Sequence, residues 1–361
     1  MSTMFEYIKW RGDLSFTDNR LNEVDGAILS MISYIDFGAI SGGRDMLLRD
    51  AAQGYCPDMK YDSVRLGLII PSKNINKLFC DAAASKRFGT LTVSDYQAKT
   101  SDEENCQFAA VSFHMPNKRV VVVFRGTDDS IVGWREDFCL SYLDEIPSQR
   151  LAVEYIEMIA DKYPDRRIYI CGHSKGGNLS MYATVNCSAD TRERIIRSYC
   201  YDGPGLSRKM VSSQEFRDSS RKLQIYVPQS SYIGTMFERG KRYTVINSGR
   251  QGARQHDSFS WSVDVSEFER VPELSPKGKK NEEQFRASMD RMTPQEKKDF
   301  VETFFSMVYS TGAHTLTDFS SGGLKKLNVI IKNYSGLDKP KREMLIKLIG
   351  KLFDVKLISA D

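Results

Sequence analysis

Residues 168–179 read Ile-Tyr-Ile-Cys-Gly-His-Ser-Lys-Gly-Gly-Asn-Leu, and this stretch decides the fold. Its apolar beginning is typical of a short buried strand, and the residues after it predict a helix over about 175–185. Between them, residues 172–176 match G-x-S-x-G, a sharp turn that presents a nucleophilic serine between strand and helix. Glycine two residues before and after the serine leaves room for the strand and helix to approach closely. Because the pattern alone is short, its strand-turn-helix context carries the prediction.

The flanking sequence predicts a sheet around this stretch. Further strands are expected over 91–99, 106–114, 118–124, 197–202, 222–228 and 241–247. Residues 119–124 read Arg-Val-Val-Val-Val-Phe, a continuously apolar run that is typical of a strand buried on both faces. A helix is expected over 149–163, ended by Pro164. Alternating apolar strands and amphipathic helices predict an α/β fold with a central, mostly parallel sheet and helices on both faces.

Composition excludes several classes of protein. The chain has 361 residues, 41% hydrophobic and 27% charged, as in folded globular proteins. No apolar run reaches membrane-spanning length, and the N-terminus lacks a signal-peptide core. The net charge of +4 is too small and scattered to predict nucleic-acid binding. Seven dispersed cysteines without a CxxC pair predict free thiols, hence a cytoplasmic protein without disulfides or a zinc site.

The organisation along the chain predicts residues 1–262 as the main domain, with a helical insertion at about 44–88. Residues 263–361 are expected to be a helical extension that packs on the core or caps the site. Asn22 is positioned to cap an early helix, and Thr293 begins a capping box. Residues 274–283 are typical of a linker, and two last helices are expected over 323–334 and 340–353.

A second segment supports the serine turn. Residues 124–127 read Phe-Arg-Gly-Thr and close the buried strand. Acyl transfer needs two hydrogen-bond donors for the developing oxyanion, one of them the N–H after the nucleophile. These donors are predicted to be the backbone N–H groups of Lys175 and Thr127. The Lys175 side chain is either solvated or available to an anionic group on the substrate.

Together these motifs resemble those of the class 3 (fungal-type) lipases of the α/β-hydrolase superfamily and, more closely, a bacterial family of lipase-like proteins. The resemblance covers about residues 15–262. The matching segments are 125–129 (Arg-Gly-Thr-Asp-Asp), 133–138 (Gly-Trp-Arg-Glu-Asp-Phe), 172–178 (Gly-His-Ser-Lys-Gly-Gly-Asn), 202–205 (Asp-Gly-Pro-Gly) and 255–257 (Gln-His-Asp). The resemblance implies an α/β-hydrolase fold with Ser174 as the nucleophile.

A serine nucleophile needs a base, and His256 is the predicted one because it follows the last strand of the sheet. His173 adjoins the serine but is expected to point away from it. His114 precedes the oxyanion segment in the chain, and His314 lies in the helical tail. A surface histidine in a polar loop is the alternative for His256.

The acid that orients this base is harder to assign. Class 3 lipases carry it after the strand that corresponds to 222–228, where this chain reads Pro-Gln-Ser-Ser without a carboxylate. Some animal lipases carry it on the preceding strand, which here ends at Asp202. Asp202 is therefore the predicted acid, unless it only caps the Asp-Gly-Pro turn. Asp257 is too near His256 in sequence, and Glu238 is a remote alternative.

The predicted function is acyl-ester hydrolysis through a Ser-His-Asp acyl-enzyme, with no metal or organic cofactor. The acyl pocket is predicted to include the apolar run of Tyr232, Ile233, Met236 and Phe237. The expected partner is a small acyl ester or lipid, and the basic tail after residue 323 is compatible with contact at an anionic membrane. An acyltransferase and a catalytically degenerate binding protein on the same fold are the alternatives. Oligomeric state, acyl chain length and head group stay open.

Overall fold

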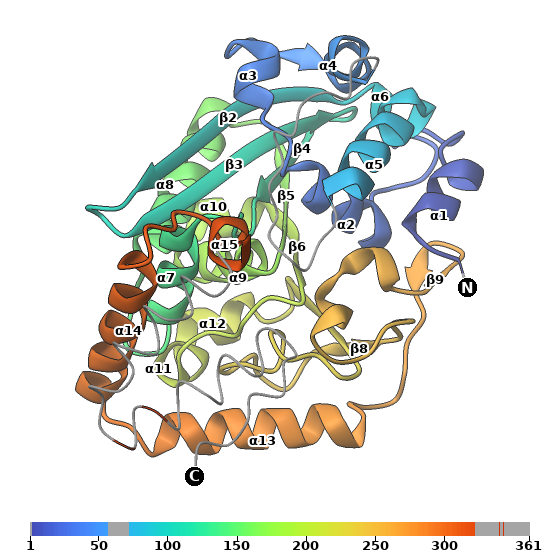
Figure 1. Ribbon diagram of the computed structural model, residues 1–361. Helices are drawn as coiled ribbons and strands as arrows, with labels where there is room; N and C mark the ends of the chain where they lie inside the picture. Colours follow the sequence, from blue (N-terminus) through green and yellow to red (C-terminus); the bar gives the residue numbers. More distant parts are fainter. Residues whose placement is uncertain (1, 57–71, 322–338, 340–341, 343–361) are drawn as a thin grey trace.

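A single sheet of eight strands forms the centre of the molecule (Figure 1). The computed structural model describes residues 2–56, 72–321, 339 and 342. The strands are β1 Met46–Leu47, β2 Thr92–Ser101, β3 Cys106–Met115, β4 Arg119–Phe124, β5 Arg167–His173, β6 Ile195–Tyr201, β7 Leu223–Pro228 and β8 Thr244–Ile246. They lie in sequence order, antiparallel from β1 to β4 and parallel from β4 to β8. The predicted α/β sheet is confirmed.

Strand β4 is buried on both faces, as its continuous apolar run predicts. Val121 and Val123 pack on one side with helices from the first ninety residues. Val120, Val122 and Phe124 pack on the other side with the helices that flank the serine turn. Successive side chains of a strand point to opposite faces, so a strand covered on both sides must be apolar throughout.

Helices cover both faces of this sheet (Figure 1). On one face lie α1 Met4–Arg11, α2 Glu23–Ile32, α5 Ser72–Ala84 and α6 Lys86–Gly89. On the other lie α8 Pro147–Lys162 and α9 Lys175–Asn186, with α10 Ala189–Arg194 and α12 Gln214–Ser219 beside them. The remaining short helices are α3 Phe37–Ser41, α4 Leu48–Tyr55, α7 Ile131–Cys139 and α11 Arg208–Val211. The segment predicted as helical over 44–88 is helical where described, except that β1 joins the sheet edge.

Two predicted helix starts are confirmed. The Asn22 side chain accepts hydrogen bonds from the N–H groups of Val24 and Asp25 at the start of α2. The Thr293 and Glu296 side chains form a reciprocal capping box at α14, Pro294–Tyr309. Each cap pairs backbone N–H groups that the first helical turn leaves without a partner.

The prediction of a linker over 274–283 is wrong, because most of it belongs to helix α13, Pro276–Asp290. Ser275 caps the helix and proline occupies its first position, which is a start signal that the lysine-rich composition obscured. Glu282 of this helix forms an ion pair with Arg239 at 2.8 Å, so α13 is tied to the loop before β8.

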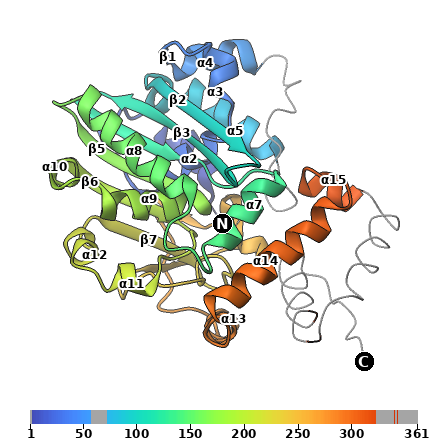
Figure 2. The ribbon, with the colours of Figure 1, turned by 90° about the vertical axis from the view of Figure 1, so that its left-hand side faces the viewer.

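The chain after residue 262 first returns to the main core. Strands β9 Val263–Asp264 and β10 Glu267–Phe268 form a small hairpin, and Phe268 is buried in the core cluster that contains α2. Helix α14 then packs beside α7 (Figure 2), and α15 Leu316–Ser321 ends the described part. The helices predicted over 323–334 and 340–353 and the basic tail lie outside the described residues, apart from 339 and 342.

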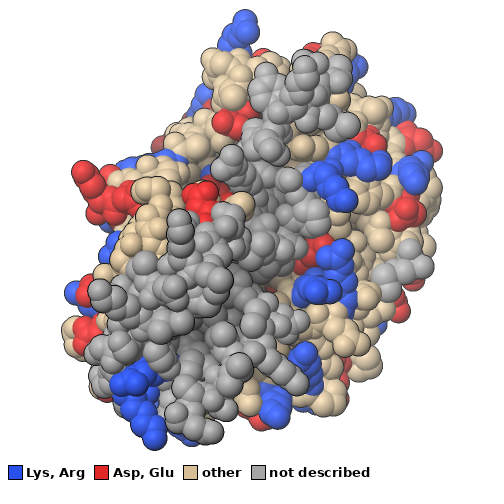
Figure 3. Space-filling view, in the orientation of Figure 1, with Lys and Arg blue, Asp and Glu red and all other residues tan. Residues whose placement is uncertain are grey.

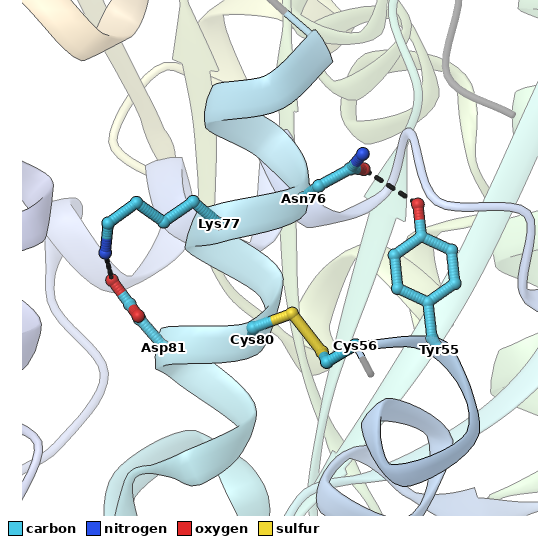
Figure 4. Close-up of a disulfide and its surroundings, with 6 residues drawn as sticks. All are labelled: Tyr55, Cys56, Asn76, Lys77, Cys80 and Asp81. Carbon is cyan, nitrogen blue, oxygen red and sulfur yellow. Dashed lines mark hydrogen bonds and ion pairs between the residues drawn. A yellow bond between two sulfur atoms is a disulfide. The ribbon is translucent and has the colours of Figure 1, made fainter. Parts of the chain in front are cut away.

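The prediction that all cysteines are free is wrong for one pair. Cys56, directly after α4, and Cys80 on α5 form a disulfide across the helices that cover the sheet edge (Figure 4). Sequence spacing could not reveal it, because folding brings together two cysteines that are 24 residues apart. The other five cysteines are free and buried. Disulfides are uncommon in a reducing cytosol, so this pair removes one of the reasons for the cytoplasmic prediction.

The described surface carries both signs of charge. In Figure 3, basic and acidic side chains lie next to one another along the right-hand edge of the visible face. This mixture agrees with the small net charge of +4. Within the described ranges, no helix is both long and apolar enough to cross a bilayer.

Candidate active site

Ser174 lies between β5 and α9 in a backbone conformation that non-glycine residues rarely adopt, with φ of +58° and ψ of −128°. The predicted need for glycine on either side of it is confirmed. A Cβ on Gly172 would lie 2.2 Å from the backbone of Gly176, and one on Gly176 would lie 2.1 Å from the carbonyl oxygen of Phe124. The turn therefore depends on close backbone contact that any side chain would prevent.

Asp202 and His256 contact one another beside this turn. His256 Nδ1 donates to Asp202 Oδ2 at 2.7 Å, and the Asp202 side chain is fully buried. His256 keeps 10% of its side chain exposed. Because its Nδ1 hydrogen points to the carboxylate, Nε2 is the ring nitrogen left to accept a proton. The predicted contact between these two residues is present, although they are 54 positions apart in sequence. The predicted hydrogen bond between the Ser174 hydroxyl and His256 Nε2 is not formed among the described residues.

The loop after β7 holds the Asp202 carboxylate. Asp202 Oδ1 accepts hydrogen bonds from Ser231 Oγ at 2.6 Å and from the Gly234 N–H at 3.0 Å. Residues 228–231, where class 3 lipases would place the acid, thus supply a donor to the carboxylate that directly follows the neighbouring strand β6. Sequence reasoning missed this role of Ser231. Of the alternative acids, Asp257 pairs with Arg250 at 2.8 Å and Glu238 pairs with Arg208 at 3.2 Å.

The backbone around His256 is fixed by three buried side chains. His173 Nε2 donates to the His256 carbonyl oxygen at 2.8 Å. Burial lowers the pKa of His173 well below its usual value, so this ring is neutral. Trp261 Nε1 donates to the backbone carbonyl oxygen of Gln255 at 2.7 Å. The side-chain oxygen of Gln255 accepts from the Ser230 N–H, also at 2.7 Å. These contacts were not predicted, since no local pattern marks them.

The Phe-Arg-Gly-Thr segment runs next to Ser174. A Cβ on Gly126 would lie 3.3 Å from Ser174 Cβ, 2.6 Å from the carbonyl of His173 and 2.2 Å from the Tyr34 hydroxyl. Thr127 follows, and its hydroxyl donates to Asp137 Oδ2 at 2.5 Å. In the described part of the chain, the N–H groups of Thr127 and Lys175 donate to no protein acceptor. Both are therefore available to a bound oxyanion.

The Lys175 side chain is neither solvated nor available to a substrate, so both interpretations of it are wrong. It is fully buried and points into the protein. Its Nζ donates to the carbonyl oxygen of Gln107 at 2.7 Å, to Gln107 Oε1 at 2.6 Å and to Glu136 Oε2 at 3.0 Å. A lysine at a helix start is usually exposed, and here the buried carboxylate of Glu136 on α7 and the two oxygens of Gln107 reverse that expectation.

The four residues predicted for an acyl pocket lie in the loop between β7 and β8, all of them half-buried. The carbonyl oxygen of Met236 accepts a hydrogen bond from the Gly205 N–H at 2.8 Å. The Phe237 ring packs edge-on against Phe285 of α13, with 5.2 Å between centroids. Phe237 also lines a small surface pocket with Leu140, Leu143, Tyr182 and Met210, and neither Ser174 nor His256 lines that pocket. Tyr232 and Ile233 directly follow Ser231 in the chain.

The two remaining histidines lie elsewhere. His114 is on β3, where its Nε2 is 3.1 Å from Ser112 Oγ and 3.6 Å from Asp95. Ser112 is fully buried, so the serine of this second grouping with histidine and aspartate has no access to solvent. His314 is an exposed residue in the loop before α15. Neither histidine contacts Ser174 or Asp202 through any hydrogen bond in the described residues.

Comparisons with known proteins agree with this architecture. A family model described as Mbeg1-like matches residues 82–306, which is more than half of the chain. No curated protein sequence matches. Among solved structures, M37 lipase is 14% identical, over 60% of this chain and 70% of that one, with a TM-score of 0.39. Lipase II from Rhizopus niveus is 11% identical, over 76% of this chain and 87% of that one, also with a TM-score of 0.39.

At such identities and TM-scores these two likenesses carry no argument about chemistry. The fold assignment depends instead on the sheet order, the strained serine between β5 and α9, and the family match. The chain belongs to the Mbeg1-like family and has the fold of a lipase-like α/β-hydrolase.

Proposed function

We propose that the protein is a serine hydrolase of acyl esters, with Ser174 as nucleophile, His256 as general base and Asp202 as the acid that orients it. The observation that carries this proposal is the buried 2.7 Å contact between His256 and Asp202 beside the elbow serine. A carboxylate on Nδ1 fixes the tautomer in which Nε2 accepts a proton. A binding protein would need neither this pair nor a strained serine.

The reaction has two steps. His256 Nε2 takes the Ser174 hydroxyl proton while Oγ forms a bond to the ester carbonyl carbon. The resulting oxyanion accepts hydrogen bonds from the N–H groups of Lys175 and Thr127, and each such donor contributes about 3 kcal/mol to transition-state stability. His256 then gives its proton to the leaving alkoxide as the carbon–oxygen bond breaks. Water repeats the sequence on the acyl-enzyme, releasing the acid and restoring Ser174.

The test is labelling by a fluorophosphonate, which phosphonylates activated serines. Wild-type protein should be labelled at Ser174, and Ser174→Ala should lose the label while keeping its melting temperature. Ser112→Ala is the matched control, because Ser112 also lies beside a histidine and an aspartate but is buried away from solvent. Labelling that persists in Ser174→Ala would overturn the assignment.

Substrate class follows from a series of p-nitrophenyl esters with two to sixteen acyl carbons. We expect kcat/KM to rise with chain length, because each buried methylene contributes up to about 0.8 kcal/mol. A series that is flat or falls from the shortest ester would leave a small-ester hydrolase and remove the lipid substrate. Added alcohols or amines would reveal an acyltransferase through ester or amide products in place of the free acid.

A further inference from the structure

Two buried residues connect the elements that carry the oxyanion donors. Lys175 follows the nucleophile at the start of α9, and Glu136 lies on α7, close after the Thr127 loop. Both side chains are fully buried, and Lys175 Nζ lies 3.0 Å from Glu136 Oε2. We propose that Lys175 is a positioning residue whose buried ammonium ties the nucleophile turn to helix α7 and so fixes the distance between the two oxyanion donors.

The pair is held at both ends. Glu136 Oε1 accepts from the Ser148 N–H at 2.8 Å, and Oε2 accepts from the Gln107 N–H at 3.0 Å. Gln107 also gives Lys175 its carbonyl and side-chain oxygens. Burial acts to lower the pKa of Lys175, but the carboxylates of Glu136 and Asp137 hold it above the usual value. The ammonium therefore stays charged and bound on three sides.

Asp137 extends this connection to the second donor. Its Oδ1 lies 3.9 Å from Lys175 Nζ, and this buried oxygen has no hydrogen-bond partner in the described residues. Its Oδ2 accepts the hydrogen bond from the Thr127 hydroxyl. One chain of contacts thus runs from the backbone of Lys175, through its ammonium and Asp137, to Thr127. Each end of this chain is a residue whose N–H is a proposed oxyanion donor.

Stability alone is a poor reason for such a pair. Taking an ammonium and a carboxylate out of water costs several kcal/mol each, and apolar replacements of buried ion pairs are often neutral or stabilising. Geometry is a better reason, since hydrogen bonds from an ammonium to several acceptors are directional, whereas hydrophobic contacts are not. A displacement of about 1 Å at a catalytic group can cost about 100-fold in rate. This inference rests on the proposed hydrolase function for its catalytic consequence.

The test replaces both members of the pair. Lys175→Met alone would leave Glu136 buried without its partner and could prevent folding, so the double variant Lys175→Met/Glu136→Gln removes both charges at nearly constant volume. The control is Ile159→Ala. Ile159 is fully buried in α8, far along the helix from Ser148, and does not contact the site. Its replacement by alanine should lower stability by leaving a cavity in the core. Melting temperature is measured for each variant.

In p-nitrophenyl ester hydrolysis, we expect kcat of the double variant to fall about 100-fold while KM stays within about twofold of wild type. The Ile159→Ala variant should keep kcat. Unchanged kcat in the double variant, a loss confined to KM, or an equal loss in Ile159→Ala would each overturn the proposal.

Amide hydrogen exchange separates this inference from the proposed function. Exchange over residues 124–130 and 172–178 should be faster in the double variant than in wild type or Ile159→Ala, whether or not the protein hydrolyses esters. Wild-type protein that is not labelled and does not hydrolyse esters would refute the proposed function. If exchange in the double variant is nevertheless faster, the inference that Lys175 and Glu136 hold the two loops together remains. If wild-type protein is active and exchange in these segments is unchanged, the tie fails and the proposed function remains.

Discussion

The replacement Asp202→Asn tests the proposed catalytic acid without changing its size. The asparagine oxygen can still accept from Ser231 Oγ and the Gly234 N–H. Its amide group then presents two N–H donors to His256 Nδ1, which must give up its own hydrogen and accept instead. The ring proton moves to Nε2, and the nitrogen that should take the Ser174 proton is already occupied.

The size of the loss distinguishes two explanations. Loss of one charge-assisted hydrogen bond costs about 2 kcal/mol, or about 30-fold in rate. The wrong tautomer costs about 10,000-fold in kcat, or about 5 kcal/mol in the transition state. Because Asp202 is fully buried and His256 Nδ1 donates to its Oδ2 directly, we expect the larger value.

The assay is steady-state hydrolysis of a p-nitrophenyl ester, with fluorophosphonate labelling rate as a second measure. Asp95→Asn is the control, since Asp95 is also a nearly buried carboxylate that accepts from a serine, Ser112, but lies with His114 away from the site. Asp202→Asn activity within tenfold of wild type would refute Asp202 as the orienting acid. A large loss in Glu238→Gln instead would favour the alternative acid.

Three further predictions concern the elements around the site. Gly176→Ala should lower the free energy of unfolding by about 1–3 kcal/mol, because the new Cβ would lie 2.1 Å from the Phe124 carbonyl oxygen. Urea denaturation measures this change, and a variant as stable as wild type would contradict the close-contact argument. Because burial depresses the pKa of His173, its contribution to stability is fully present above about pH 6.5 and is lost as pH falls below that value. The melting temperature should therefore fall more steeply between pH 7 and pH 5 in wild type than in His173→Gln, and parallel curves would show that His173 is not the group concerned. Peptide mapping without reduction should recover Cys56 linked to Cys80, and Cys56→Ser/Cys80→Ser should lose about 3 kcal/mol of stability, whereas two free thiols in the oxidised protein would rule the bond out.

Local patterns predicted the frame of the molecule well. The strands around residues 119–124 and 168–171 could be identified because a strand covered on both faces must be apolar along its whole length. The serine turn could be identified because the close approach of neighbouring backbones leaves room only for glycine on either side of the serine. The linker predicted over 274–283 is wrong because its lysine-rich composition is typical of a linker, whereas the serine cap and first-turn proline begin helix α13.

Contacts between distant parts of the chain were predicted only where chain order constrained them. Asp202 and His256 could be paired because the resemblance to lipases implies a base after the last strand and an acid at the end of an earlier one. Nothing local indicates that Ser231 donates to Asp202, that Glu136 meets the Lys175 ammonium, or that Cys56 meets Cys80. Such pairs depend on how α7, β7 and α5 pack, which no periodic pattern encodes.

The turn at Ser174 also bears on whether the protein is an enzyme or a binding protein on a degenerate fold. Gly176 closes against β4, His173 holds the backbone of His256, and the Lys175 ammonium reaches β3 and α7. Packing of sheet and helix could use these contacts alone. It would not require the backbone of Ser174 at φ of +58°, a conformation that costs about 1–3 kcal/mol and persists where surrounding structure enforces it.

Nor would packing require the fully buried Asp202 carboxylate to accept a hydrogen bond from one nitrogen of the His256 ring, which remains partly exposed. Burying an Asp–His pair costs desolvation free energy, and the position of the ring beside Ser174 gives a catalytic reason for that cost. The cost of the strained serine and the cost of the buried carboxylate arise at different residues, and proton transfer from Ser174 to His256 accounts for both. For this reason the hydrolase is the stronger hypothesis, although the proposed acid, Asp202, directly follows β6 and does not follow β7 as in class 3 lipases.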